Sequence, residues 1–136
     1  MARRLGGTYF PKLDDKGRLT LPAKYREHFA DGVVVTRVQE GCLAVYDVET
    51  FDSLDARFES RATGEADVRA YQRWLNSGSH DDVPDRQGRI ALPAPLRAFA
   101  GLDHDVVVLG AGDRVEVWEP ERWAQQSEHL DEVFST

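Results

Sequence analysis

One pattern of apolar and polar positions occurs twice along this chain. Short segments with alternating side chains, at residues 19–21 and 90–92, each follow a turn that contains glycine. A proline then begins a segment with helical spacing, which predicts short helices that end at Gly32 and Gly101. Two apolar runs separated by a turn come next and predict a β-hairpin, with strands at 33–37 and 42–46 in one case and 106–109 and 115–118 in the other.

The residues themselves also repeat. The segment LDDKGRLTLPAKYR at 13–26 returns as PDRQGRIALPAPLR at 84–97. Both segments keep an aspartate, a glycine, an arginine, a leucine, a proline, an alanine and a second arginine, which are Asp14 and Asp85, Gly17 and Gly88, Arg18 and Arg89, Leu21 and Leu92, Pro22 and Pro93, Ala23 and Ala94, Arg26 and Arg97. An internal repeat indicates two structural copies. The function is therefore to be sought in what both copies retain.

Helices are predicted between and after the copies. Asp47 can cap a helix with an apolar stripe, and a second helix is expected over 65–75 after a break at 61–64. A third should begin at Pro120. We therefore expect a first repeat at 7–53, a helical insert at 54–77, a second repeat at 78–123 and an acidic C-terminal helix at 124–136. Each copy is too small to bury its apolar face alone, which predicts a mainly β, α+β fold in which both copies interleave into one small barrel.

Composition supports a globular chain. Of its 136 residues, 41% are hydrophobic and 30% are charged, which is enough for a core and argues against global disorder. The aliphatic runs are far shorter than the roughly 20 residues that cross a bilayer. The single cysteine, Cys42, has no internal disulfide partner, and no apolar segment follows Arg3 and Arg4 as it would in a signal peptide. We expect a cytoplasmic protein without a membrane partner.

Charge is distributed unevenly. The net charge of -7 argues against a uniformly basic nucleic-acid binder. Residues 1–26, however, carry seven basic side chains and only two acidic ones, whereas from Glu119 onward acidic side chains predominate. Such asymmetry can orient a protein on a polyanion.

Two arginines are the leading candidate binding residues. Arg18 and Arg89 each follow a tight turn and share a strand face with a small residue, Thr20 or Ala91, so they are expected to point away from the core. A fixed guanidinium can contact phosphate, or the O6 and N7 atoms of guanine in a bidentate manner. The alternative is that each arginine pairs with Asp14 or Asp85 of its own turn and only braces that turn. Both roles can coexist.

Other basic residues are weaker candidates. Phosphate contacts are predicted for three lysines of the first copy, although scattered lysines are also typical of ordinary solvated surface: Lys12, Lys16 and Lys24. The second copy has Val83, Gln87 and Pro95 at these places, so the two copies are not expected to contact DNA equally. Arg26 and Arg97 are expected to have structural roles, such as pairing with carboxylates.

Catalytic, metal and cofactor sites are not indicated. The repeat explains Asp14 and Asp85 as turn residues beside Gly17 and Gly88, rather than as a catalytic carboxylate pair. Cys42 has no accompanying histidine, and the four histidines lack the spacing of metal ligands. We therefore predict no enzyme, no metal and no cofactor.

Together, LDDKGRLTLPAKYR, DRQGRIALPAPLRAFAGL and VEVWEPERW resemble the MraZ family, which uses a D-x-x-x-R motif twice. The resemblance extends from about Gly7 to Trp123. It implies tandem AbrB-like halves with swapped hairpins in one pseudo-symmetric barrel, and a ring-shaped homo-oligomer that is octameric in some members. It also implies a nucleoid-associated transcriptional regulator, expected to be a repressor, that binds direct repeats in double-stranded DNA upstream of its own division and cell-wall operon.

By this resemblance the DNA-binding arginines fall on Arg18 and Arg89, with Asp14 and Asp85 as their motif partners. A rival interpretation is an antitoxin-like module that uses the same fold to bind a protein. The two differ in salt dependence, because phosphate contacts make DNA binding strongly sensitive to salt.

Overall fold

The computed structural model describes residues 4–61 and 65–135. Arg3 of the basic N-terminal segment and residues 62–64 of the expected break lie outside the described residues. The strands are β1 (Thr8–Tyr9), β2 (Arg18–Thr20), β3 (Val33–Arg37), β4 (Leu43–Asp47), β5 (His80–Asp82), β6 (Arg89–Ala91), β7 (Val107–Gly110) and β8 (Val115–Trp118). The helices are α1 (Ala23–Arg26), α2 (Val48–Arg61), α3 (Ala66–Ser77), α4 (Ala94–Ala100) and α5 (Pro120–Phe134).

The chain has a mixed α+β fold in which strands from the two copies pair with each other. The main sheet has the order β1-β7-β8-β4-β3-β5, and its strand pairs are antiparallel. β1 of the first copy pairs with β7 of the second, and β5 of the second copy pairs with β3 of the first. Pairing of β4 with β8 joins the two hairpins. Among the described residues β1 and β5 are the edges of this sheet, so the closed barrel stays a prediction.

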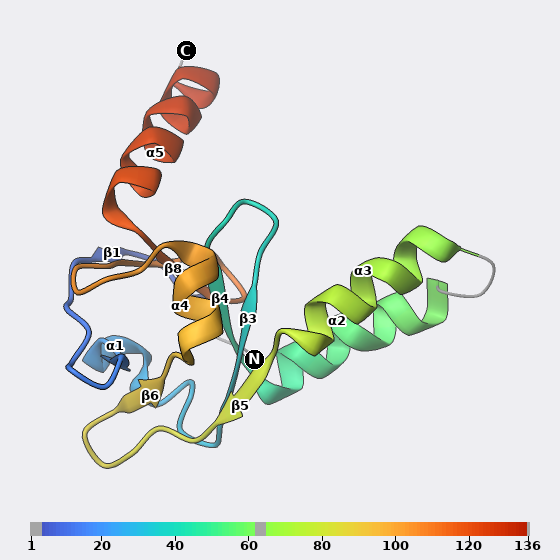
Figure 1. Cartoon of the computed structure of the whole chain (residues 1–136), viewed down its shortest axis with the longest axis horizontal. Coiled ribbons are helices and arrows are strands. Elements are labelled where there is room, and N and C mark those ends of the chain that lie inside the picture. Colours follow the sequence, from blue (N-terminus) through green and yellow to red (C-terminus); the bar gives the residue numbers. More distant parts are fainter. Residues whose placement is uncertain (1–3, 62–64, 136) are drawn as a thin grey trace.

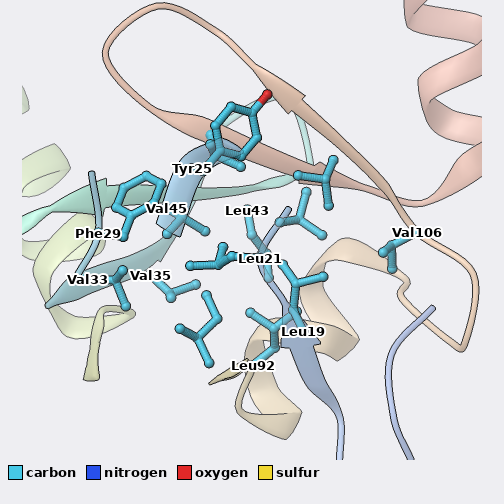
Figure 2. Packing of buried hydrophobic residues seen from close by; sticks show 14 of the residues in the cluster. Leu19, Leu21, Tyr25, Phe29, Val33, Val35, Leu43, Val45, Leu92 and Val106 are labelled. Atoms are coloured by element: carbon cyan, nitrogen blue, oxygen red, sulfur yellow. The ribbon is translucent and has the colours of Figure 1, made fainter. Parts of the chain in front are cut away.

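A separate two-stranded ribbon consists of β2 and β6, one strand from each copy. The fully buried Leu19 and Ile90 lie opposite each other on its inner face. Figure 2 shows Leu19, Leu21 and Leu92 directed toward Val35 and Leu43 of the main sheet. Complete burial of one such side chain contributes about 1.5–3 kcal/mol. The core therefore fixes which face of the ribbon points outward, because a slip by one residue would expose these side chains.

The short helices cover the core as the pattern predicted, with one difference in length. α4 ends at Gly101, which has a left-handed conformation (φ +68°), and it buries Leu96 and Ala100. α1, however, ends at Arg26 instead of continuing toward Gly32. Beyond it, turns replace regular helix. One of them is closed by the 3.1 Å hydrogen bond from the Gly32 N–H to the Phe29 carbonyl, three residues earlier. Tyr25 and Phe29 are nevertheless fully buried.

Longer helices project from the sheet. Figure 1 shows α2 and α3 side by side as a hairpin on one side, and α5 extending away on another. Asp47 caps α2 as predicted, because its carboxylate accepts the Thr50 N–H at 2.7 Å. α5 is anchored near its start, where Trp123 packs against Trp118. No helix in the described part of the chain has the length and apolar character needed to cross a membrane.

Candidate nucleic-acid interface

The outer face of the β2–β6 ribbon brings the two candidate arginines together. Arg18 lies opposite Ala91, and Arg89 lies opposite Thr20. Paired residues point to the same side of a ribbon, so both arginines lie on the face opposite Leu19 and Ile90. They occupy diagonal positions, for which the residues are typically about 7–8 Å apart and the Cβ atoms somewhat closer. Sequence reasoning placed each arginine on a surface but did not foresee that both share one ribbon.

The first turn, at residues 14–17, holds Arg18 through the carboxylate of Asp14. One carboxylate oxygen accepts the backbone N–H groups of Lys16 and Arg18 at 2.9 and 2.8 Å, and the other accepts Nε–H of Arg18 at 2.6 Å. The Gly17 N–H closes the turn on the Asp14 carbonyl at 2.9 Å. Gly17 has φ +75°, a conformation that favours glycine.

The second turn, at residues 85–88, reproduces this geometry. Asp85 accepts the N–H groups of Gln87 and Arg89 at 2.9 Å each, and Nε–H of Arg89 at 2.7 Å. Gly88 has φ +77°. The expected bracing of each arginine by its own aspartate is therefore present in both turns.

Bracing leaves much of each guanidinium available. From each guanidinium, the aspartate accepts only the Nε–H group. Within the described part of the chain neither Arg18 nor Arg89 uses its Nη1 or Nη2 atoms in a hydrogen bond. The two arginine side chains are 31% and 30% exposed. Four terminal N–H donors per arginine thus remain for a ligand, in an orientation that the carboxylate fixes.

The two aspartates are held in their charged forms. The backbone N–H of Arg18 is the main cause that lowers the pKa of Asp14, and the Arg18 side chain and the Lys16 N–H act in the same direction against the opposing effect of desolvation. The pKa of Asp85 is lowered in the same way, chiefly by the Arg89 N–H. Ionised carboxylates accept hydrogen bonds only, so at neutral pH each remains a fixed partner for its arginine.

The three candidate lysines do not all lie at the first turn. Lys24 is on α1, whose Arg26 covers Gly88 of the second turn, so only Lys12 and Lys16 belong to the first turn. Lys16 lies in the turn itself, Lys24 is exposed on α1, and Lys12 forms an exposed ion pair with Asp105 at 3.7 Å. An exposed pair of this kind contributes little to stability. Lys12 can therefore exchange Asp105 for a phosphate at small cost.

Contrary to the expectation, Arg26 and Arg97 form no ion pair with a carboxylate among the residues that the structure describes. Arg26 donates Nε–H to the Leu21 carbonyl at 3.1 Å, and Arg97 donates Nε–H to the Leu92 carbonyl at 2.8 Å. Each arginine thus hydrogen-bonds the backbone immediately after a ribbon strand, which is a structural role. No sequence pattern distinguishes a carbonyl partner from a carboxylate partner for such residues.

Other chemically active side chains lie apart from the ribbon. Cys42 is fully buried, and burial raises the pKa of its thiol far above the ordinary value, as a structural thiol requires. Glu116 is buried but satisfied by Arg114 at 2.8 Å and by the Trp118 indole N–H at 3.0 Å. No group of three metal-ligating side chains occurs among residues 4–61 and 65–135.

Comparisons with known proteins agree with the repeat. The profile of the MraZ family, described as "MraZ protein, putative antitoxin-like", matches residues 5–74 and 77–136. Proteins named Transcriptional regulator MraZ from Micrococcus luteus and Kocuria rhizophila are 47% and 46% identical over 129 residues, which is 95% of this chain and 90% of each relative. A protein of the same name from Leifsonia xyli is 48% identical over 117 residues, 86% of this chain and 82% of that protein. The chain belongs to the MraZ family.

Proposed function

We propose that this protein is a transcriptional regulator that binds double-stranded DNA in a sequence-specific manner through the outer face of the β2–β6 ribbon. Its targets are direct repeats upstream of its own division and cell-wall operon, where it acts as a repressor, and its location is the cytoplasm and nucleoid. The names of its relatives support regulation of transcription. The ribbon supplies the means of contact.

The observation that carries this proposal is the pair of braced arginines on one outward face. A two-stranded β-ribbon fits the major groove, and an arginine there can read guanine through two parallel hydrogen bonds. Arg18 and Arg89 keep their terminal nitrogens available while Asp14 and Asp85 fix their direction. Lys12, Lys16 and Lys24 add phosphate contacts that set position and affinity.

Self-association completes the proposal. One ribbon gives few contacts, whereas several ribbons in a ring, octameric in our proposal, would engage tandem repeats with much higher avidity. α5 has a surface suited to this, because none of its described residues is buried and Val133 and Phe134 are 51% and 77% exposed. Light scattering should give a mass several times the 15.3 kDa of one chain.

The proposal is tested by titrating a labelled duplex from the region upstream of the protein's own gene. The variant Arg18→Ala/Arg89→Ala should lose at least about thirtyfold in affinity at matched salt, if each arginine supplies about 1–3 kcal/mol. The control is Arg57→Ala, which removes the same charge from the exposed surface of α2. Equal affinities of wild type and the double variant would reject the ribbon as the DNA-binding face.

An antitoxin-like protein-binding function is the second candidate, because the description of the matching family includes that term. The salt dependence of binding separates the two candidates. About six phosphate contacts should cost roughly a thousandfold in DNA affinity between low and moderate salt. Weak DNA binding that is insensitive to salt, together with a co-purifying protein ligand, would favour the second candidate.

A further inference from the structure

Each turn of the ribbon is covered by an arginine from the other copy. A Cβ atom placed on Gly17 would lie 2.5 Å from Nε and 2.6 Å from Cζ of Arg97, so the Arg97 guanidinium lies directly over Gly17. In the same way a Cβ atom on Gly88 would lie 2.6 Å from Nε of Arg26. The absence of a side chain at Gly17 and Gly88 leaves room for these guanidinium groups, and the positive φ of both residues favours glycine.

Backbone hydrogen bonds close each of these contacts into a loop. The Gly17 carbonyl accepts the Leu92 N–H at 3.3 Å, and the Leu92 carbonyl accepts Nε–H of Arg97, which returns to Gly17. The equivalent loop of the other copy joins Gly88, Leu21 and Arg26, with 2.8 Å between the Leu21 nitrogen and the Gly88 oxygen. We call these two loops the crossed clasps.

The crossed clasps act on the residues next to the DNA-contacting arginines. Gly17 immediately precedes Arg18 and closes the turn on Asp14, the residue that orients the Arg18 guanidinium. Gly88 has the same relation to Asp85 and Arg89. A planar guanidinium packed over the glycine restricts the movement of that turn, and a lysine cannot replace it because it lacks the planar group.

We propose that Arg97 is a positioning residue for Arg18, and that Arg26 is a positioning residue for Arg89. Each acts across the two copies, on the turn to which it does not belong. The proposal rests on the proposed DNA-binding function for its effect on affinity, but the clasps themselves can be tested without DNA.

The test without DNA is amide hydrogen exchange, measured by mass spectrometry on the intact protein. Amides in the first turn are bonded within it, for example the Asp14 N–H to the Arg18 carbonyl at 3.0 Å. Arg97→Ala should accelerate exchange at residues 14–18 about tenfold, the loss expected when a hydrogen bond to a charged group is removed, and leave 85–89 unchanged. Arg26→Ala should do the reverse. Faster exchange in the same copy as the substitution, or equally in both turns, would overturn the proposal.

The test with DNA is a double-mutant cycle on the duplex from the region upstream of the gene. Arg97→Ala should weaken binding about tenfold in the wild-type and Arg89→Ala backgrounds, and add little in the Arg18→Ala background. Equal losses of affinity in the Arg18→Ala and Arg89→Ala backgrounds would overturn the proposal. Absence of DNA binding by the wild type would instead reject the proposed function, and hydrogen exchange would still decide whether the clasps exist.

A charge-conserving variant separates positioning from direct phosphate contact. Arg97→Lys keeps the charge, so it would retain a phosphate contact, but it should bind about as weakly as Arg97→Ala if Arg97 acts through Gly17. Full affinity of Arg97→Lys would overturn the proposal. Thermal unfolding is measured for every variant, and if Arg97→Ala does not fold, the cycle and the exchange measurement are made with Arg97→Lys.

Discussion

The first and second turns hold their arginines in the same geometry but differ in the charge around them. Asp14 and Asp85 each bond two backbone N–H groups and one Nε–H, with corresponding distances that agree within 0.1 Å. Lys12 and Lys16 lie beside and in the first turn, whereas the corresponding places of the second copy hold Val83 and Gln87. Lys24 lies on α1, whose Arg26 covers Gly88 of the second turn.

The direction of the arginines and the attraction of phosphate therefore have different structural origins. The direction of each arginine is set by turn geometry, which depends on backbone hydrogen bonds and is therefore the same in both copies. Phosphate attraction depends on exposed side chains, which can change without disturbing the fold. We infer that the first half of the ribbon contributes more to affinity, while both halves contribute to sequence recognition.

The largest expected effect comes from comparing the two arginines singly. Arg18→Ala should weaken binding to the upstream duplex about tenfold to a hundredfold, and Arg89→Ala less, because the lysines draw the first turn closer to the phosphates. Fluorescence anisotropy at matched salt, with Arg57→Ala as the charge control, measures both. The reverse order would show that the second turn makes the closer contact.

A smaller gain is expected from giving the second turn a lysine. Gln87 corresponds to Lys16, and its backbone N–H already bonds Asp85, so Gln87→Lys should leave the turn intact. One added phosphate contact should increase affinity at low salt and steepen the dependence of log affinity on log salt by about 0.9. An unchanged slope would indicate that the second turn lies away from the phosphates.

The smallest difference between the turns is expected in their response to pH. Folding lowers the pKa of both aspartates below their ordinary value of 3.8, so each contributes stability that is present above that value and lost as the pH falls through the lower folded pKa. The destabilisation by Asp14→Asn or Asp85→Asn should be constant from roughly pH 7 to 5 and shrink below 3.8. Thermal unfolding of the wild type and both variants measures this. A change in the destabilisation centred near pH 6 would contradict the assignment of this effect to the two aspartates.

Much of the fold followed from the sequence because the repeat and the glycine-terminated segments are local signals. The two hairpins and the caps at Asp47 and Gly101 were predicted in this way. The pairing of β1 with β7 and of β5 with β3 was not, because pairing between distant strands depends on the complete core rather than on local pattern.

The candidate site was predictable residue by residue but not as an assembly. Alternation placed Arg18 and Arg89 on the surface, and turn chemistry placed Asp14 and Asp85 beside them. Nothing in the local sequence indicated that β2 and β6 would pair with each other, or that Arg26 and Arg97 would cover glycines of the opposite copy. These features depend on the register between the two copies, which only the assembled fold defines.

Photocrosslinking from position 20 tests the central claim most directly. Thr20 is exposed on the outer face of the ribbon, directly opposite Arg89 and two residues from Arg18. A photoreactive amino acid in place of Thr20 should crosslink to the upstream duplex, whereas the same group in place of Arg57 on α2 should not. Crosslinking from position 57 but not from position 20 would show that another face of the molecule binds DNA.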